Sequence, residues 1–434
     1  MTEKQALEFL EYLQTLGSVP GLDTIKELLK RLDNPQDQLS FVHIAGTNGK
    51  GSVALLVSET LKNAGYQVGR YISPTISDYR ERFSVNGKMI TKKDLYRLLA
   101  QLKSVCEEMV KDGFAHPTAF EVETALSFLY DIEKKCDLVV LECGMGGFMD
   151  ATNVVKNTLV CVFASISMDH MSFLGNTLGK IATQKSGIIK EGADIVCYPS
   201  KEEALNQILK EAKEKNIPDE NICITDENLI KDKKYGLLKQ KMSYKSYRKL
   251  TLSLAGKHQL INAAVALDTI EALKRKGYDI PKESVMDAFS QATWPGRMEI
   301  IQKKPLMIMD GAHNEDAAKK LAASIEEYFL GKRLIYIMGV FQDKEYEKII
   351  DLTCRYASQI ITIKTPNNPR ALSAYELAQA VARVNPNVTN VDSLEEAVEI
   401  SSLFADKDSV ILVFGSLSFL GELKNIVQKK EKKK

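Results

Sequence analysis

The sequence predicts an α/β protein of two domains, the first with a mostly parallel sheet and the second smaller and doubly wound. Two observations predict this fold class. Apolar runs of strand length alternate with stretches of helical period along most of the 434 residues. This alternation restarts after a Trp-Pro-Gly-Arg segment at 294–297, which indicates a linker. A chain of this length is expected to hold two or three domains with sizeable cores.

The expected elements follow from these patterns in chain order. Buried apolar runs predict strands of the first domain at 41–45, 67–72, 137–141, 159–163 and 194–198. Helical spacing predicts helices within 1–40, broken at 17–21, and at 53–64, 92–111, 118–134, 179–190, 202–215 and 262–275. Strands of the second domain are predicted at 306–309, 334–338, 359–363, 388–390 and 410–414. We place the domains at 1–296 and 297–428 and a Lys-rich tail at 429–434, with an exposed loop at 75–86 and a hairpin or loop at 226–248.

The composition argues against several classes of protein. Lysine and arginine number 58 against 57 acidic residues, and this balance speaks against a nucleic-acid or membrane-surface partner held by bulk charge. The seven cysteines have no C-x-x-C spacing, as expected in a reducing compartment. The sequence has no apolar run of membrane-spanning length and no signal-peptide pattern. We therefore expect a soluble, cytoplasmic protein.

A glycine-rich turn between the first strand and the next helix predicts a phosphate site. The turn reads Gly46-Thr-Asn-Gly-Lys-Gly-Ser52 and follows the strand at 41–45. Its glycines let several backbone N–H groups point at one spot, and the start of the helix adds a positive dipole end. Lys50 would add a point charge, and the Ser52 hydroxyl is a plausible Mg²⁺ ligand. The usual pattern has Ser or Thr directly after Lys, whereas Gly51 intervenes here, so a chance glycine turn is the alternative.

Polar residues follow three successive strands beside this turn. Ser73 comes after the second strand, Glu142 ends the third and His170 follows the fourth. Ligands of open α/β sheets gather at the carboxyl ends of strands, and a carboxylate is the usual partner of a Mg²⁺–nucleotide site. The alternatives are capping for Ser73 and simple packing for His170. We expect these residues to share one site.

Other candidates have weaker signals. Lys185 lies among small residues, so a ligand would be able to approach it closely, although a surface lysine is the alternative. Asn262 on the first turn of an Ala-rich helix would recognise a purine edge or cap that helix. Asp310 and His313 end the first strand of the second domain, where they would meet a nucleotide or cap the next helix.

The segment Ala45-Gly-Thr-Asn-Gly-Lys-Gly-Ser52 resembles the nucleotide loop of the folylpolyglutamate synthase and dihydrofolate synthase family, relatives of the Mur cell-wall ligases. The resemblance covers nearly the whole chain in order. The matching blocks are Ser73-Pro74, Glu81-Arg82, Phe120-Glu121, Leu141 to Asn153, Asp169-His170, Leu174-Gly175, Ile181 to Lys190, His258 to Asn262, Pro295 to Arg297, Asp310 to Asn314 and Gly415 to Leu417.

The resemblance implies a Mur-ligase-like P-loop ATPase domain followed by a Rossmann-like glutamate ligase domain, acting with ATP and Mg²⁺. It assigns ATP binding to Thr47, Asn48, Gly49, Lys50, Gly51, Ser52, Asn262, Arg297 and Asp310, and metal binding to Ser73, Glu142, His170 and a carbamylated Lys185. It gives catalytic roles to Lys50, Lys185 and His313, and folate contacts to Ser18, Thr118, Phe120 and Phe148. The implied reaction joins L-glutamate to a folate or dihydropteroate through an acyl phosphate, in a monomer.

Four positions depart from the family pattern. Gln184 replaces a usual Glu, Phe148 a usual Arg, Glu315 a usual Pro, and Thr75 a usual His or aromatic residue. Phe148 and Thr75 fall in loops expected to touch the pterin, so they bear on substrate preference. The rival hypotheses are a Mur-type cell-wall ligase, a regulatory P-loop ATPase and a binding protein with an inactive ATP site. Only about 40 residues precede the loop, fewer than a typical domain, which disfavours the Mur-type rival.

Overall fold

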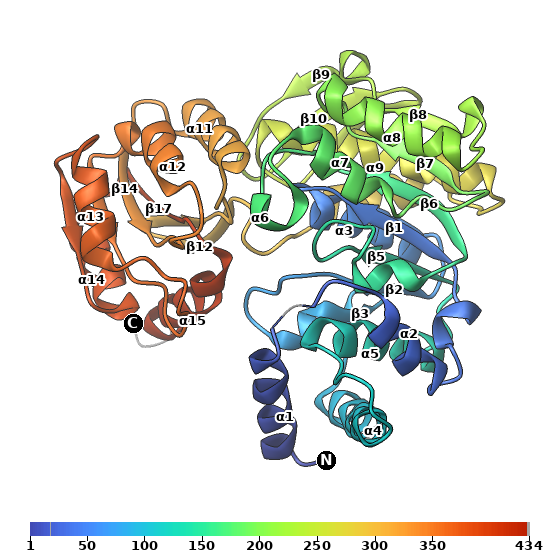
Figure 1. The fold of residues 1–434 in the computed structure, drawn as a ribbon. Helices are drawn as coiled ribbons and strands as arrows, with labels where there is room; N and C mark the ends of the chain where they lie inside the picture. Colours follow the sequence, from blue (N-terminus) through green and yellow to red (C-terminus); the bar gives the residue numbers. More distant parts are fainter. Residues whose placement is uncertain (18, 432–434) are drawn as a thin grey trace. The chain divides into compact units, whose positions relative to one another are not determined.

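The computed structural model describes residues 1–17 and 19–431, and the chain divides into two compact units (Figure 1). The first unit consists of Met1–Pro74, Arg80–Ile230 and Ile261–Phe289, and the second of Thr75–Tyr79, Lys231–Leu260 and Ser290–Lys434. Ile76, from the short segment that follows Pro74, packs into an apolar cluster of the second unit. The domain boundary between 296 and 297 stays a prediction.

The first unit contains an eight-stranded sheet in the order β4-β3-β2-β5-β1-β6-β7-β8. Six neighbouring strands are parallel, while β3 and β4 run antiparallel at one edge. The strands are β1 (Phe41–Ala45), β2 (Val68–Tyr71), β3 (Phe83–Val85), β4 (Lys88–Met89), β5 (Leu138–Glu142), β6 (Thr158–Phe163), β7 (Asp194–Cys197) and β8 (Ile222–Ile224). Because β1 lies inside this sheet between β5 and β6, all five of its residues are buried.

Helices cover the sheet of the first unit. They are α1 (Glu3–Thr15), α2 (Asp23–Lys30), α3 (Lys50–Asn63), α4 (Lys92–Lys111), α5 (Ala119–Glu133), α6 (Met171–Leu174), α7 (Leu178–Ser186) and α8 (Glu202–Glu214), with α9 (Lys257–Arg275) and α10 (Lys282–Gln291) lying mostly in this unit. Ile181 of α7 and Ile208 of α8 pack with Phe163 and Ile195 of the sheet in one buried cluster. Since α9 begins at Lys257, Asn262 lies in its second turn rather than its first.

The second unit is built on a six-stranded sheet in the order β12-β13-β17-β14-β15-β16. Only the β12–β13 pair is antiparallel. The strands are β12 (Glu299–Lys303), β13 (Leu306–Met309), β14 (Arg333–Met338), β15 (Gln359–Thr362), β16 (Val388–Asn390) and β17 (Ser409–Phe414). The predicted strands are present, and β12 is an additional one that its mixed polar sequence did not indicate.

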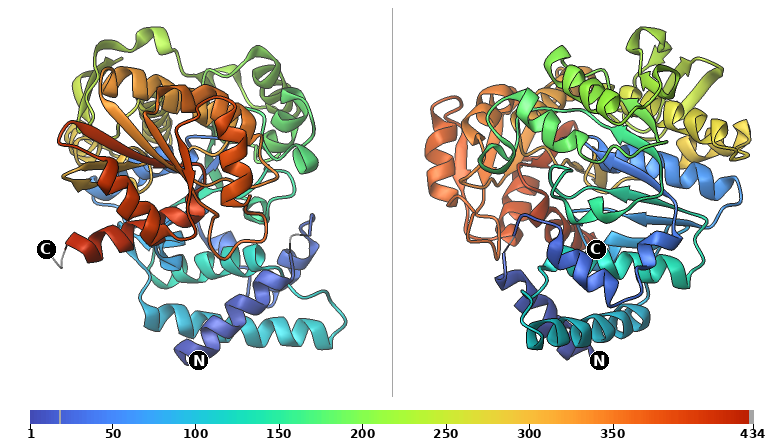
Figure 2. Two further views of the ribbon diagram at one scale, coloured as in Figure 1. Left: turned by 90° about the vertical axis from the view of Figure 1, so that its left-hand side faces the viewer. Right: turned by 45° about the vertical axis from the view of Figure 1, so that its right-hand side comes forward.

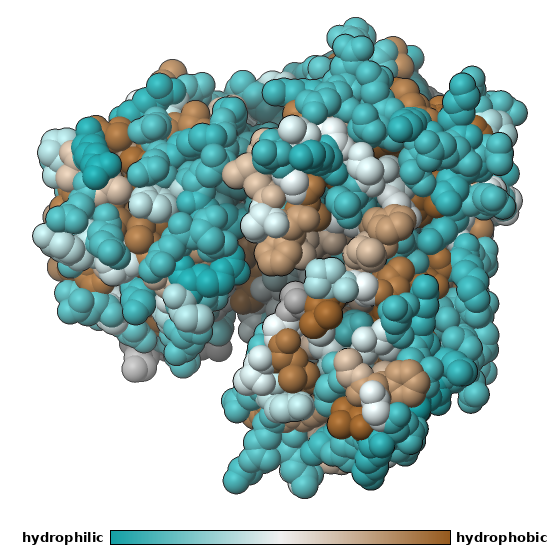
Figure 3. Space-filling model, viewed as in Figure 1, coloured by the Kyte–Doolittle hydropathy of each residue, from teal (hydrophilic) through white to brown (hydrophobic). Residues whose placement is uncertain are grey.

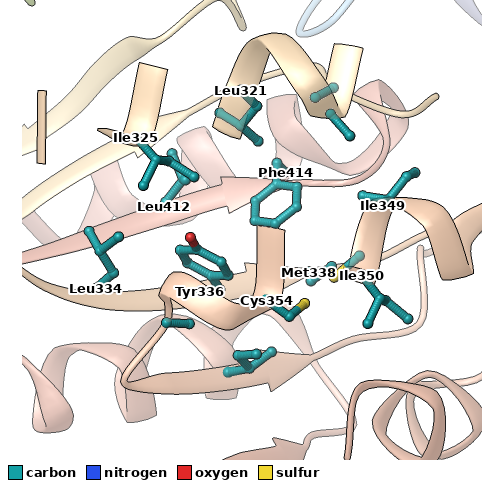
Figure 4. Packing of buried hydrophobic residues seen from close by; sticks show 14 of the residues in the cluster. Leu321, Ile325, Leu334, Tyr336, Met338, Ile349, Ile350, Cys354, Leu412 and Phe414 are labelled. Carbon is teal, nitrogen blue, oxygen red and sulfur yellow. The ribbon is translucent and has the colours of Figure 1, made fainter. Parts of the chain in front are cut away.

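Side chains of the second sheet alternate between two apolar cores. Tyr336 and Phe414 point to one face, where their rings meet edge to face with centroids 5.1 Å apart (Figure 4). Ile337 and Val413 point to the other face. The helices α11 (Glu315–Phe329), α12 (Tyr346–Thr353) and α13 (Ala374–Ala382) cover the first face, and α14 (Leu394–Phe404) and α15 (Leu420–Glu431) cover the second (Figure 2). The doubly wound arrangement follows from this period of two.

The region at 226–248 forms antiparallel hairpins, which is one of its two predicted outcomes, rather than a loop. It contributes to a three-stranded antiparallel sheet, in the order β11-β10-β9, made of β9 (Lys231–Lys234), β10 (Gln240–Tyr244) and β11 (Tyr247–Leu252). Met242 of β10 pairs with Leu250 of β11, and both side chains are buried. The apolar residues are few and widely spaced between lysines, so the sequence pattern did not fix the bounds of these strands.

Two further segments differ from expectation. Residues 83–85 of the predicted exposed loop form the buried strand β3, and α15 extends through Glu431, so the part of the predicted tail at 429–431 is helical. The visible surface is largely hydrophilic, with scattered apolar patches (Figure 3). Among the described residues, no helix is both long and apolar enough to cross a membrane.

Candidate active site

The glycine-rich turn joins β1 to α3 and is held tightly against the neighbouring chain. Gly46 has a φ of +151°, and a Cβ there would lie 2.8 Å from that of Ala164. The backbone N–H of Thr47 donates to the Ser165 carbonyl at 2.7 Å. Gly49 has a φ of +92°, which favours glycine, and it directly precedes the first residue of α3. The turn therefore has the backbone of a phosphate-binding loop.

Lys50 lies at the centre of this turn. Its Nζ donates to the Gly46 carbonyl at 3.2 Å and approaches the Thr47 carbonyl at 3.5 Å. The same nitrogen lies 3.7 Å from Oε1 of Glu142, whose side chain is only 6% exposed at the end of β5. The structure thus brings together the predicted phosphate cation and the predicted acidic residue. Ser52, on the first turn of α3, is also buried.

Ser73 and His170 are the other two residues predicted to lie at strand ends. Tyr71 of β2 pairs with Leu141 of β5, so Ser73 and Glu142 follow neighbouring strands at the same edge of the sheet. His170 comes later, after β6 and directly before α6, with a left-handed φ of +49° and 43% exposure of its side chain. Its Nε2 lies 3.9 Å from Oδ1 of Asp169. A metal site shared by Ser73, Glu142 and His170 stays a prediction.

Lys185 is a buried cation beside the phosphate loop. It lies on α7, is 4% exposed, and its Nζ donates to the Gly46 carbonyl at 2.9 Å. Burial, followed by the positive charge of Lys50, lowers the pKa of Lys185 to about 7. Two lysines therefore converge on the same carbonyl, which is a costly arrangement unless one is neutral or chemically modified.

Asn262 contacts the phosphate loop from α9. A Cβ built on Gly49 would lie 2.7 Å from Oδ1 of Asn262, so the amide presses directly against the loop backbone. The side chain is 3% exposed. Asn262 does not cap α9, because it lies inside that helix, and its contact with the nucleotide stays a prediction.

The second unit gathers the remaining predicted ATP residues. Asp310 is 8% exposed after β13, and its carboxylate accepts from the backbone N–H groups of Met298 and Ala312, each at 3.0 Å. Burial raises the pKa of Asp310, while the charge of Arg297 acts in the opposite direction. A Cβ on Gly311 would lie 2.1 Å from Nη1 of Arg297, so the guanidinium covers this glycine. Arg297 and Asp310 thus form one cluster.

His313 belongs to the same turn of the second unit. Its Nδ1 is 2.8 Å from the Gly311 carbonyl, which is the geometry of an N–H donating to a carbonyl. A neutral ring with the proton on Nδ1 leaves Nε2 as an acceptor. Asn314, the next residue, caps α11 by accepting from the Ala317 N–H at 2.9 Å. Capping in this turn is therefore done by Asn314.

The predicted folate residues Thr118 and Phe120 lie at the start of α5. Thr118 caps the helix in a reciprocal pair with Glu121, whose carboxylate accepts from the Thr118 N–H at 2.7 Å and from its hydroxyl at 2.8 Å. The Phe120 ring lies over Gly144, where a Cβ would come within 2.5 Å of it. Ser18 lies outside the described residues. Thr118 therefore has a structural role, whereas Phe120 borders the loop after β5.

Phe148 is presented by a loop fastened to α7. Its side chain is 54% exposed, while its backbone N–H donates to the Gln184 carbonyl at 2.7 Å. The buried Asn153 amide donates to the carbonyls of Phe148 and Gly187, both at 3.1 Å. A Cβ on Gly187 would lie 2.6 Å from the Phe148 backbone. The loop is therefore tied to the helix that carries Lys185.

A buried polar network supports the base of the same loop. Asp150 accepts from the Met145 N–H at 2.7 Å and from the Thr152 hydroxyl at 2.6 Å. Nε2 of His43, in the middle of β1, lies 2.9 Å from Oγ1 of Thr152 and 3.1 Å from Sγ of Cys143. Burial lowers the pKa of His43 to about 3, so this ring is neutral. These residues and Asn153 were not among the predicted site residues, because they act on the loop through tertiary contacts that no sequence spacing reveals.

Replacing Asn153 by alanine should loosen this loop. Two hydrogen bonds would be lost and two carbonyls left without that donor, so we expect the free energy of unfolding to fall by about 1–3 kcal/mol. The Phe148 N–H should also exchange faster with solvent. Hydrogen-exchange mass spectrometry and chemical denaturation would measure both effects, with Asn157→Ala as the control, because the exposed Asn157 amide donates to the Ser40 hydroxyl at 2.8 Å. Unchanged exchange at Phe148 would show that Asn153 does not fasten the loop.

The side chains predicted to bind the metal ion indicate whether Mg²⁺ would fit. Among residues 1–17 and 19–431, no group of three or more His, Cys, Asp or Glu side chains gathers as a metal site. The predicted set contains only Glu142 and His170 of these types, together with the Ser73 hydroxyl. Carboxylate and hydroxyl oxygens suit Mg²⁺, and a buried carboxylate beside a phosphate loop fits that ion when a nucleotide completes the coordination.

Comparison with known families matches both parts of the chain. The family described as Mur ligase middle domain matches residues 44–270, and the one described as Mur ligase, glutamate ligase domain, matches residues 296–417. The chain is 34% identical over 420 residues to a protein of Bacillus subtilis (strain 168) named dihydrofolate synthase/folylpolyglutamate synthase. That alignment covers 94% of this chain and 95% of the relative.

Solved structures agree with these relatives. Mycobacterium tuberculosis folylpolyglutamate synthase complexed with ADP superposes with a TM-score of 0.90 at 26% identity, covering 98% of this chain and 99% of that chain. E. coli FolC in complex with DHPP and ADP gives a TM-score of 0.84 at 25% identity, covering 98% of each chain. The predicted fold class is thereby confirmed.

Proposed function

This chain belongs to the folylpolyglutamate synthase and dihydrofolate synthase family of the Mur ligase superfamily, and we propose that it uses ATP to join L-glutamate to a folate-type acceptor. The observation that carries the proposal is the assembly of Lys50, Glu142 and Lys185 around one phosphate-type loop. The Mur-type and regulatory alternatives are less supported, because curated relatives matched over most of the chain are named for folate ligation.

The proposed reaction has two steps. An oxygen of the acceptor carboxylate attacks the γ-phosphorus of ATP, and the bond from that phosphorus to the bridging oxygen breaks. ADP is released, and the acceptor is now an acyl phosphate. The free amine of L-glutamate then attacks the activated carbonyl carbon. The bond from carbon to the phosphate oxygen breaks, the nitrogen gives up a proton, and inorganic phosphate leaves with an amide formed.

The residues of the phosphate loop would stabilise the charge in the first step. Its backbone N–H groups and the Lys50 ammonium offset negative charge on the transferring oxygens. Asn262, beside the loop, is assigned to the nucleotide together with Arg297 and Asp310 of the second unit. Bound Mg²⁺ would neutralise phosphate charge, and Ser73, Glu142, His170 and a carbamylated Lys185 are the residues that would hold it.

His313 would act on the incoming glutamate. Its Nδ1 proton is committed to the Gly311 carbonyl, so a neutral ring offers Nε2 as an acceptor. That nitrogen is suited to orient the glutamate ammonium or to receive the proton released when the amide forms. Its assignment rests on the family resemblance and on this tautomer.

The acceptor would be a tetrahydrofolate or its polyglutamate, and also dihydropteroate. The E. coli structure named above holds DHPP with ADP, and the B. subtilis relative is named for both activities. Phe148, exposed on its fastened loop, and Phe120 are the aromatic residues we assign to the pterin side of the site. Thr118 and Ser18 remain predicted contacts only. We further propose that the enzyme works as a monomer in the cytoplasm.

ADP release tests the proposal directly. The purified protein should release ADP only when ATP, Mg²⁺, L-glutamate and a folate-type acceptor are all present, because phosphoryl transfer needs the acceptor carboxylate and turnover needs the amine. Dihydropteroate, tetrahydrofolate and a cell-wall precursor would be compared as acceptors. Release that depends on the cell-wall precursor alone would favour the Mur-type alternative, and release without glutamate would favour a regulatory ATPase.

A further inference from the structure

His43 is a buried residue of the first unit that the proposed reaction has not used. It lies in the middle of β1 and is 0% exposed. Its Nε2 atom lies 2.9 Å from Oγ1 of Thr152 and 3.1 Å from Sγ of Cys143. Among residues 1–17 and 19–431, no hydrogen-bond partner meets its Nδ1 atom. A buried polar atom without a partner is costly, so the presence of histidine inside this strand calls for a reason.

The Thr152 hydroxyl has a single proton, which it donates to the Asp150 carboxylate. Oγ1 of Thr152 lies 2.6 Å from Oδ1 of Asp150, a distance typical of a hydroxyl that donates to a charged oxygen. The carboxylate also accepts from the backbone N–H groups of Met145, at 2.7 Å, and Thr152, at 3.0 Å. Three donors favour its ionised form. The hydroxyl oxygen of Thr152 is therefore an acceptor toward His43.

The proton of the His43 ring consequently lies on Nε2. Without it, the lone pair of Nε2 would face the lone pairs of the Thr152 oxygen at 2.9 Å, which is repulsive. The Cys143 sulfur beside Nε2 is a weak acceptor for the same N–H. Burial, followed by the charge of Lys190, lowers the pKa of His43 to about 3, so the ring is neutral and Nδ1 carries no proton. Hydrogen bonds therefore run in one direction, from His43 to Thr152 and from Thr152 to Asp150.

The turn that presents Phe148 ends at Asp150. The backbone N–H of Asp150 donates to the Gly147 carbonyl at 3.1 Å, so Phe148 and Met149 are the two central residues of this turn. The N–H of Met145, two residues before Gly147, is held by Oδ2 of Asp150. A shift of the Asp150 carboxylate would therefore displace the exposed Phe148 ring.

We propose that His43 is a positioning residue for the folate-type acceptor, acting through Thr152 and Asp150 on the loop that presents Phe148. The identity of this ligand rests on the proposed function, which assigns Phe148 to the pterin side of the site. The directed hydrogen bonds fix the Asp150 carboxylate between Thr152 and Met145. A histidine in the apolar centre of a sheet is thus explained by the loop that it holds.

The backbone and the side chain of His43 lead to different parts of the site. The backbone of β1 continues into Gly46 and the phosphate loop. The hydrogen bonds of the ring go instead to Cys143 and Thr152, in the segment that follows β5. Loss of these hydrogen bonds should therefore affect the acceptor, whereas general damage to β1 would affect ATP as well.

Two amide substitutions of His43 distinguish its two ring nitrogens. The side-chain nitrogen of glutamine reaches about as far as Nε2 of histidine, whereas that of asparagine reaches only as far as Nδ1. His43→Gln should therefore leave KM for the acceptor within about twofold of the wild type, while His43→Asn should raise it by about fivefold to tenfold, the factor expected for one buried hydrogen bond. Neither variant should change KM for ATP. Equal acceptor KM values for the two variants, or an equal rise in KM for ATP, would overturn the proposal.

Thr152→Val tests the second step of the relay. Valine keeps the branched shape but lacks the hydroxyl, so KM for the acceptor should rise by a similar factor, and adding His43→Asn should change it little further. The control is Thr269→Val, because Thr269 is also buried in the first unit and its hydroxyl donates to the Val265 carbonyl at 2.8 Å. This control should leave the acceptor KM unchanged. Fully additive effects of Thr152→Val and His43→Asn would show that the two residues act separately, contrary to the proposal.

Two further measurements separate this proposal from the proposed function. In protein labelled with ¹⁵N-histidine, NMR at pH 7 should show the His43 ring protonated on Nε2 and not on Nδ1. The chain has five histidines, so loss of one signal in His43→Gln would assign it. Hydrogen exchange at the Met145 amide should be faster in His43→Asn than in His43→Gln. Both results would support the held loop even if the wild type released no ADP, and a ring protonated on Nδ1 would overturn it.

Discussion

Replacing Lys50 by alanine is expected to lower kcat/KM for ATP-dependent glutamate ligation by about 10³-fold. The Nζ of Lys50 lies inside the phosphate loop, 3.2 Å from the Gly46 carbonyl, so its charge is already in position before ATP binds. Removing one preorganised charge-stabilising group typically costs 10²–10³-fold, and a cation on the transferring phosphate belongs at the upper end of this range. ADP release measured with saturating glutamate and acceptor would give the loss.

The fold should survive this substitution. Lys50 stands at the first position of α3, where alanine is a good helix former, and the helix is held by its buried apolar residues. Circular dichroism and thermal unfolding should therefore change little. Lys62→Ala is a matched control, since Lys62 lies near the end of the same helix and pairs with Glu59 at 2.8 Å. Activity of Lys50→Ala within tenfold of the wild type would remove the loop from the mechanism.

Lys185→Ala should be almost as damaging, and short carboxylates should partly restore its activity. The unmodified Lys185 is buried beside Lys50, and burial lowers its pKa to about 7, so much of the amine is neutral near pH 7. A neutral amine reacts with CO₂: a nitrogen–carbon bond forms and a proton leaves, giving a carbamate. Carbamylation replaces the positive charge of Lys185 by a negative one, so Lys185 and Lys50 become an opposite-charge pair. The carbamate also supplies oxygens for a metal ion.

Three measurements would check this prediction. Native mass spectrometry of the wild type should show the mass of one added carbamate, which Lys185→Ala and Lys185→Arg should lack. Acetate or formate should restore part of the activity of Lys185→Ala, whereas Lys185→Arg should stay inactive despite its positive charge. Lys180→Ala is the control on the same helix, because Lys180 is exposed and its side chain donates to Oδ1 of Asn176. An active Lys185→Arg enzyme would contradict the metal-ligand assignment.

Strands with continuous apolar runs were predictable because burial on both faces of a parallel sheet demands such runs. The strand at 41–45 and the one at 306–309 have the expected bounds, and the phosphate loop follows the first of them. The sheet β9–β11 was predicted only as a hairpin or loop, for the opposite reason. It buries only one face, its inward residues such as Met242 are separated by lysines, and its edge strand β9 is wholly exposed. Local composition therefore left a hairpin and a loop as alternatives.

Site residues that belong to a sequence motif could be predicted, whereas site residues that are placed by tertiary packing could not. Lys50 and Glu142 meet as expected, since the loop and the strand end are neighbours in any sheet of this order. The tie from Asn153 to α7 joins segments about 30 residues apart through side-chain hydrogen bonds to carbonyls. Such bonds leave no periodic trace in the sequence. His170 follows β6 as expected, although residues 164–169 separate it from the end of that strand.

The path of the polypeptide limits how this enzyme can be dissected. The chain passes from one compact unit to the other five times, at 74/75, 79/80, 230/231, 260/261 and 289/290. Ile76 is carried into the second unit by the shortest of these excursions, where its Cδ1 lies against Gly296. A fragment that begins at residue 297 would lack Ile76 and the whole of β9–β11. Apolar side chains that these residues cover would then be exposed to water. Variants for crystallography or labelling should therefore keep the chain continuous, and proteolysis between Pro74 and Ile76 would break the covalent link between Ser73 and the segment that carries Ile76.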